Sequence, residues 1–237
     1  MTEPAPILYE DNHLLIVNKQ AGQIVQGDRT GDRPLVECFK DFIKERDQKP
    51  GNVFLGVAHR LDRPVSGALL FAKTGKALER ANELIRKREL SKVYWALTRN
   101  CPEIPQGKLT HCLYKNEKQN KSYPCEPTRP GAQKAELFYH VLGCSEHYTL
   151  LEVELLTGRH HQIRAQLAAI GCPIQGDLKY GDKRSNSDGS IGLHARYLKL
   201  VHPVRKTELE IIAPTPDLPL WRYFEEKFRN QSLSVAM

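Results

Sequence analysis

Short runs of alternating or continuous apolar residues dominate the chain, and such runs are typical of β-strands. The first two predicted strands lie at residues 7–9 and 14–17, with Glu10, Asp11 and Asn12 as the turn between them. Residues 123–131 and 182–192 are rich in turn-forming and polar residues and are expected to be loops. Further strands are predicted at residues 53–57, 68–72, 93–98, 135–142, 151–155, 195–201 and 207–212.

Three segments carry apolar residues at helical spacing instead. Residues 35–45 do so, and a second helix is expected directly after Thr74, which is a suitable N-cap residue. The third is TGRHHQIRAQLAAIG, residues 157–171, where Ile163, Leu167 and Ile170 share one face and Gly171 marks the end.

The order of these elements indicates the fold class. Strands outnumber helices and do not alternate with them regularly, which argues against a doubly wound parallel sheet. The expectation is an α+β fold with a predominantly antiparallel (mixed) central sheet and flanking helices. Because no repeat, low-complexity segment or break in composition occurs, residues 1–237 are expected to form a single domain.

Composition and charge narrow the class of protein. The chain has 237 residues, of which 40% are hydrophobic and 27% charged, as in ordinary globular proteins. Its net charge of +7 favours polyanionic partners, although many basic proteins bind no nucleic acid. No uncharged apolar run approaches the roughly 18 residues of a membrane span, and the start, MTEPAPILYE, does not resemble a signal peptide. A cytoplasmic protein is therefore expected.

The six cysteines are scattered and form no C-x-x-C pair, so free and mostly buried thiols are expected rather than a thiolate metal site. Adjacent His160 and His161 would diverge by about 100° on a helix, and no carboxylate or cysteine nearby completes a ligand set. No phosphate-binding G-x-x-x-x-G-K-[ST] loop occurs. Neither a metal nor a nucleotide cofactor is indicated.

The nonapeptide HRLDRPVSG, residues 59–67, places Asp62 among three potential cations, His59, Arg60 and Arg63. Predicted strands on both sides would hold this loop in place. The simpler interpretation is a surface turn tied by an Asp–Arg pair, since such exposed pairs are common and contribute little. A Ser–His–Asp triad through Ser66 is disfavoured because three residues of one short loop seldom reach that geometry.

Two further groups could carry chemistry. In the helix predicted after Thr157, His160, His161 and Arg164 would share a side away from the core, where Arg164 could hold a carboxylate ionised or bind a phosphate. Tyr94 and Trp95 begin a strand, so one faces each side of the sheet. They are either core aromatics or a platform on which a base can stack.

The segment HRLDRPVSGALLFAKT resembles the aspartate loop of RluA-type pseudouridine synthases. Other segments resemble motifs of the same family in the same order: LYEDNHLLIVNKQAG, SKVYWAL, TGRHHQIR, PIQGDLKYG and LHARYLKLVHP. The resemblance implies the pseudouridine synthase catalytic fold, no metal or organic cofactor, and isomerisation of a uridine in structured RNA, tRNA or rRNA, to its C5-glycoside. A monomer that does not bind membranes is expected. The first motif starts near Ile7, so no appended S4 domain is expected.

Carried over by position, the resemblance implies that Asp62 is the catalytic carboxylate and that Tyr94 stacks on or deprotonates the target base. Arg164 would keep Asp62 charged, and Arg60 would enter the RNA stack where the base leaves. The remaining residues expected to contribute to RNA binding or base flipping are His59, Arg63, Arg159 and His161.

The chain departs from the family pattern at Gln20, where proline is usual, and at Gln26 and Gln166, where histidine is common. These departures bear on substrate choice rather than on reaction class. Two other functions remain open: a non-catalytic RNA-binding or RNA-remodelling protein that kept the fold, and a carboxylate-based glycosidase. The second needs another well-placed acidic residue, which no motif supplies.

Overall fold

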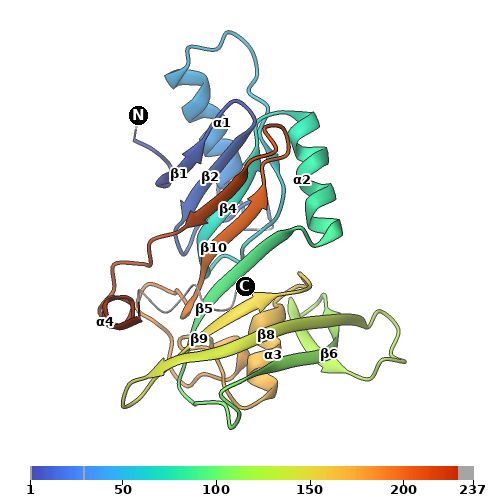
Figure 1. Ribbon diagram of the computed structural model, residues 1–237, viewed down its shortest axis with the longest axis vertical. Helices are drawn as coiled ribbons and strands as arrows, with labels where there is room; N and C mark the ends of the chain where they lie inside the picture. The colour runs from blue at the N-terminus through green and yellow to red at the C-terminus, as the bar shows by residue number, and fades with distance from the viewer. Residues whose placement is uncertain (1, 29, 229–237) are drawn as a thin grey trace. The chain divides into compact units, whose positions relative to one another are not determined.

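The computed structural model describes residues 2–28 and 30–228, which form two compact units. The first unit contains Met1–Lys92 and Ala195–Pro214, and the second contains Val93–His194 and Thr215–Met237. The chain thus leaves the first unit after Lys92, returns to it at Ala195 and leaves it again after Pro214. Figure 1 shows the elements of both units, with labels on many of them.

The first unit is built on a sheet in which β2 pairs with β1, β4 pairs with both β2 and β3, and β11 pairs with β10, each time antiparallel. The order across the sheet is β1, β2, β4, β10. The register of β2 on β4 sets Lys19 opposite Gly67, the last residue of the HRLDRPVSG loop. The strands are β1 (Ile7–Glu10), β2 (Leu14–Lys19), β3 (Gly56–Val57), β4 (Ser66–Ala72), β10 (Leu193–Val201) and β11 (Glu208–Ile212).

Two helices cover opposite faces of this sheet. Helix α1 (Leu35–Arg46) packs Phe39 against Phe71 of β4, with ring centroids 6.1 Å apart. Helix α2 (Gly75–Lys87) packs Ala77 and Ala81 against Leu70 of the same strand, β4. Leu70 is adjacent to Phe71 in the sequence, so its side chain points to the other face of the sheet. The cap predicted at Thr74 is confirmed, since its Oγ1 accepts a hydrogen bond from the Ala77 N–H at 3.1 Å.

The second unit has a five-stranded antiparallel sheet in the order β5, β9, β8, β6, β7. The pattern of the sequence missed β6 and β7 because β6 alternates mainly exposed with partly buried residues and β7 contains Pro124. Proline is tolerated in β7, which is the last strand in this order. The strands are β5 (Leu90–Thr98), β6 (Gln106–Asn116), β7 (Lys121–Cys125), β8 (Gln133–Cys144) and β9 (Thr149–Leu155).

Helices lie against both faces of the second sheet. Helix α4 (Pro219–Phe228), also not predicted, buries three aromatic side chains in a core with Trp95 and Leu150. Helix α3 (Gln162–Ala169) packs Ala165 near Leu113 and Ala135, and a 3₁₀ turn follows at Leu178–Tyr180. Because both faces are covered, β9 is buried at every residue from Thr149 to Val153 rather than on alternate residues.

The expected α+β fold class, with a largely antiparallel sheet, is confirmed. The expectation of mostly buried thiols is wrong, because Cys101 and Cys144 are exposed and Cys172 alone of the six is fully buried. Within residues 2–28 and 30–228, no helix has the length and apolar character needed to cross a bilayer. The same residues contain no cluster of three or more histidine, cysteine or acidic side chains arranged to hold a metal ion.

Candidate active site

Asp62 lies in the loop between β3 and β4, on the first unit. The Val65 N–H donates to the Asp62 carbonyl oxygen at 3.1 Å and closes a turn, and the Asp62 side chain is partly buried. Gly67, where the loop becomes strand β4, has φ +116°, and a Cβ there would collide with the backbone of Ala195. Only glycine therefore fits this position without strain.

Lys19 binds the backbone of the loop that carries Asp62. Its side chain is fully buried, and its Nζ donates to the carbonyl oxygens of Val65 at 2.6 Å, Gln20 at 3.0 Å and Arg63 at 3.2 Å. Burial lowers the pKa of Lys19 to about 7, and the negative charge of Asp62 opposes that shift. This lysine belongs to the segment LYEDNHLLIVNKQAG, but no pattern in the sequence indicated a role for it.

His59 does not act as a cation. Burial lowers its pKa to about 3, and its Nε2 accepts a hydrogen bond from the Leu70 N–H at 3.2 Å, which requires that nitrogen to be unprotonated. The loop therefore sets two cations beside Asp62 rather than the expected three. A contact of His59 with RNA stays a prediction.

The two arginines of the loop are both exposed but differ in their contacts. Arg63 forms an ion pair with Asp32, and its Nε donates to the Gly22 carbonyl oxygen at 3.1 Å. It thereby ties the loop to the segment after β2. Arg60 has no contact of this kind among the described residues, and its exposed position suits a side chain that reaches toward a ligand.

Arg164 lies on α3 in the second unit and is buried, so the expectation that it points off the core is wrong. Its guanidinium binds both oxygens of Asp177, with Nε 2.7 Å from Oδ2 and an Nη 2.9 Å from Oδ1. The guanidinium carbon also lies 5.0 Å from the centre of the Tyr180 ring. A bidentate pair in a buried setting fixes the plane of the guanidinium. Neither Asp177 nor Tyr180 was predicted to belong to the site, although PIQGDLKYG contains both.

The two histidines do not share a helical side with Arg164. Helix α3 begins at Gln162, five residues after Thr157, and His161 at its N-cap has left-handed backbone, φ 52°. His161 is buried with its Nδ1 3.0 Å from the Tyr180 hydroxyl. Burial and the charge of Arg164 lower the pKa of His161 to about 2, so it is neutral at physiological pH.

His160 connects the start of α3 to the β6–β7 hairpin. Its Nδ1 lies 2.8 Å from the Ser122 hydroxyl and its Nε2 lies 3.1 Å from Oδ1 of Asn120, while its ring stacks on His161 at 3.8 Å. Figure 1 shows α3 lying against the same sheet as this hairpin. Arg159 is exposed, and its Nε donates to the Lys134 carbonyl oxygen at 3.0 Å.

Tyr94 and Trp95 point to opposite faces of the second sheet, as expected from their positions in a strand. Trp95 is fully buried in the core beneath α4, so the interpretation as a core aromatic holds for it. Tyr94 lies opposite Val153 of β9 and is 6% exposed.

The eight predicted site residues therefore form two groups. His59, Arg60, Asp62 and Arg63 belong to the first unit. The second unit carries Tyr94, Arg159, His161 and Arg164. Hydrogen bonds hold part of each group in place. In the first group, Lys19 binds the backbone of the Asp62 loop. In the second group, Asp177 binds Arg164, and the Tyr180 hydroxyl lies within hydrogen-bond distance of His161.

Several known proteins are similar to this chain in sequence. The family model described as RNA pseudouridylate synthase matches residues 13–169. Ribosomal large subunit pseudouridine synthase C of Vibrio cholerae is 33% identical over 88% of this chain and 65% of its own length. The uncharacterized RNA pseudouridine synthase YlyB of Bacillus subtilis is also 33% identical, over 89% of this chain and 69% of its own. The chain thus spans about two thirds of the length of such relatives.

Among solved structures, human RNA pseudouridylate synthase domain containing 4 superposes with a TM-score of 0.76 at 25% identity. The match covers 94% of this chain and 93% of the human one. The family match includes both the loop that carries Asp62 and the start of α3. This chain therefore belongs to the RNA pseudouridylate synthase family, and the resemblance to its RluA-type members is confirmed.

Proposed function

We propose that this protein is an RNA pseudouridine synthase, an isomerase that converts specific uridines of structured RNA into pseudouridine. The main support for this proposal is the structure of the Asp62 loop, together with the membership of the chain in this family. A partly buried carboxylate stands in a turn whose backbone is held by the buried ammonium group of Lys19. Such a loop is built to present one carboxylate in a fixed place.

The chemistry explains why one fixed carboxylate would suffice. The N-glycosidic bond of the uridine must break, the uracil must turn while it stays bound, and C5 must join the sugar. Asp62 can serve as a nucleophile or a base in this sequence only when ionised. Asp62 lies close enough to Lys19 for its negative charge to oppose the lowering of the Lys19 pKa by burial.

We assign the supporting positive charge to Arg164, as the family motif implies. Its burial and its bidentate pair with Asp177 support the assignment, because a guanidinium held in one plane can stabilise a carboxylate without first losing conformational freedom. Asp177 is then a positioning residue that acts through Arg164.

The target base must leave its stack to reach Asp62. Flipping a base costs a few kcal/mol and costs least in loops and mismatches. Arg60, which is exposed, would fill the place that the base vacates, and Tyr94 would stack on the uracil. Stacking of this kind contributes roughly 1–3 kcal/mol per base. Ribosomal RNA is a reasonable substrate because one relative is named for the large ribosomal subunit, and a tRNA stem-loop is the alternative.

The decisive experiment compares the wild-type protein with Asp62→Asn on total RNA from cells that lack the gene, followed by pseudouridine mapping. The wild-type protein should add pseudouridine at defined sites, and Asp62→Asn should add none while it binds the same RNA with similar affinity. Asp188→Asn, in the polar loop after the 3₁₀ turn, is the matched control and should behave as wild type. Product from Asp62→Asn would refute the role of Asp62. RNA binding by a wild-type protein that makes no pseudouridine would favour the non-catalytic alternative.

A further inference from the structure

Two exposed cysteines of the second unit lie together at the end of its sheet. Cys101 follows β5 and Cys144 is the last residue of β8, and their sulfur atoms are 4.0 Å apart. Both side chains are exposed, whereas Cys172 is buried. The pair lies outside the candidate active site and takes no part in the proposed reaction, so any chemistry of these thiols is independent of that function.

The sheet register brings the two thiols together. Thr149 of β9 lies opposite Thr98 of β5 on one side and opposite Cys144 of β8 on the other. The segment that carries Cys101 is held at both ends, because Thr98 belongs to β5 and the Pro105 carbonyl oxygen accepts from the Val141 N–H at 2.7 Å. The Thr149 hydroxyl also lies 3.6 Å from the sulfur of Cys144. The proximity of the thiols thus follows from backbone pairing.

We propose that Cys101 and Cys144 are a site of oxidative modification at which hydrogen peroxide converts the two thiols into an intramolecular disulfide. One thiolate attacks the peroxide, which leaves a sulfenic acid and releases water. The second thiol then attacks the sulfenic sulfur, the S–S bond forms, and a second water leaves. Overall, two thiols and one hydrogen peroxide give one disulfide and two waters.

The geometry favours closure over the competing reactions. A disulfide needs its sulfurs about 2.05 Å apart, so the two exposed side chains must rotate to shorten the present separation of 4.0 Å. Desolvation and the neighbouring Cys144 raise the pKa of Cys101, so its thiolate is scarce at neutral pH and the first step needs alkaline conditions. The bridge would join the β5–β6 connection to the end of β8.

The test treats the full-length protein with hydrogen peroxide at pH 8.5, blocks the remaining thiols, and maps the peptides by mass spectrometry. Measured before the thiols are blocked, the intact mass should fall by two hydrogen masses. After blocking, the peptides of Cys101 and Cys144 should be found joined, with reversal by dithiothreitol. Cys101→Ser and Cys144→Ser should each prevent the bridge. Cys125→Ser is the control and should keep it, since Cys125 faces Cys112 in a different strand pair.

A second measurement tests the consequence for stability. The bridge links residues 43 positions apart, so it should raise the melting temperature of the oxidised wild-type protein and leave that of oxidised Cys101→Ser unchanged. The proposal fails if peroxide yields only sulfinic or sulfonic acids at Cys101 and Cys144. It also fails if the only bridge found joins Cys112 to Cys125.

Discussion

Lys19 and Asp177 are buried charged residues that hold other parts of the candidate site in place. Lys19 donates to the backbone on both sides of Pro64, and Asp177 binds the guanidinium of Arg164. Neither is one of the residues assigned to touch RNA. Substitution of Lys19 should therefore affect the stability of the fold, and substitution of Asp177 should affect the orientation of Arg164.

Lys19→Met should lower the free energy of unfolding by about 1–3 kcal/mol, because buried carbonyl oxygens lose their donor. The folded-state pKa of about 7 lies below the ordinary 10.5, so between these values the unfolded chain binds more protons than the folded one. Lys19 thus makes stability rise with pH from about 7 to 10.5. Urea unfolding at pH 7 and pH 9.5 should show a smaller rise in Lys19→Met. The exposed control Lys44→Met should keep the wild-type rise.

Asp177→Asn should slow single-turnover pseudouridine formation by about 10- to 100-fold, since a misplaced group near the reacting atoms can reduce the rate to that degree. The asparagine keeps one oxygen for Arg164 but loses the bidentate ionic contact. Affinity for RNA should change little, because Asp177 is buried. Wild-type rates in this variant would show that Arg164 needs no such partner. The Asp188→Asn control should react at the wild-type rate.

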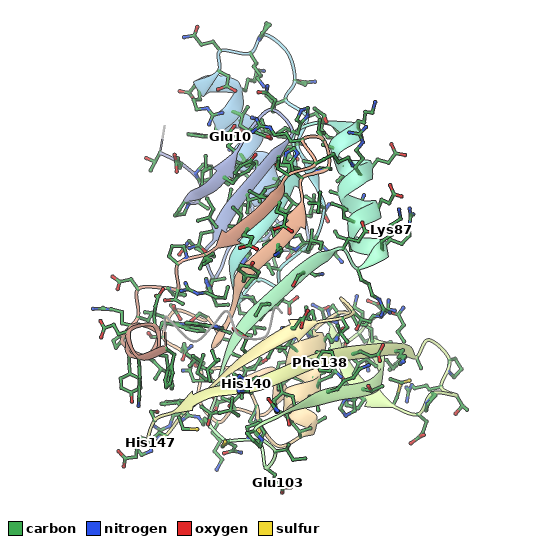
Figure 2. All side chains as sticks on the ribbon, viewed as in Figure 1. Glu10, Lys87, Glu103, Phe138, His140 and His147 are labelled. Carbon is green, nitrogen blue, oxygen red and sulfur yellow. The ribbon has the colours of Figure 1, made fainter. Side chains whose placement is uncertain are left out.

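At the scale of elements, the second sheet buries a carboxyl between strands. Glu152 of β9 lies opposite Trp95 of β5 and His140 of β8, and its side chain is 3% exposed. Figure 2 labels His140 and Phe138 along β8. Burial raises the pKa of this carboxyl to about 7, and a hydrogen bond with the Trp95 side chain opposes the shift. Burial between the paired strands is the largest cause of this shift.

Glu152→Gln should stabilise the protein at pH 7.5 by about 1–3 kcal/mol, because the wild-type chain must ionise a buried carboxyl there. The folded-state pKa exceeds the ordinary 4.5, so the folded state binds more protons between pH 4.5 and 7, and stability falls as pH rises through that range. Chemical unfolding between pH 4.5 and 7.5 should show a smaller fall in Glu152→Gln than in wild type. The exposed control Glu103→Gln should keep the wild-type pH dependence, and an unchanged dependence in Glu152→Gln would exclude this assignment.

At the scale of the whole molecule, the net charge of +7 should govern RNA affinity. Filter binding of a structured RNA should weaken by roughly tenfold or more between 50 and 200 mM salt, as released counterions predict. Asp62→Asn should show the same salt dependence as wild type, since Asp62 contributes no attraction to phosphate. Affinity that does not vary with salt would argue against a phosphate-dominated contact.

The strand pattern, the cap at Thr74 and the motif around Asp62 could all be recognised from the sequence, because each depends on residues close together in the chain. The extent of α3 could not, since His161 adopts a left-handed conformation where the pattern predicted helix. Strand β6 was also missed because its alternation is mainly polar, and its place becomes defined only by pairing with β8.

Local periodicity and short motifs were enough to identify the α+β class and the family, and they singled out Asp62 as the proposed catalytic residue. The tertiary structure alone revealed that Lys19 binds a carbonyl oxygen 46 residues away, that Arg164 binds Asp177, and that Cys101 meets Cys144. These contacts join segments distant in sequence, and their geometry depends on strand register and burial. No local pattern encodes register or burial directly, because both arise only when the segments pack against one another.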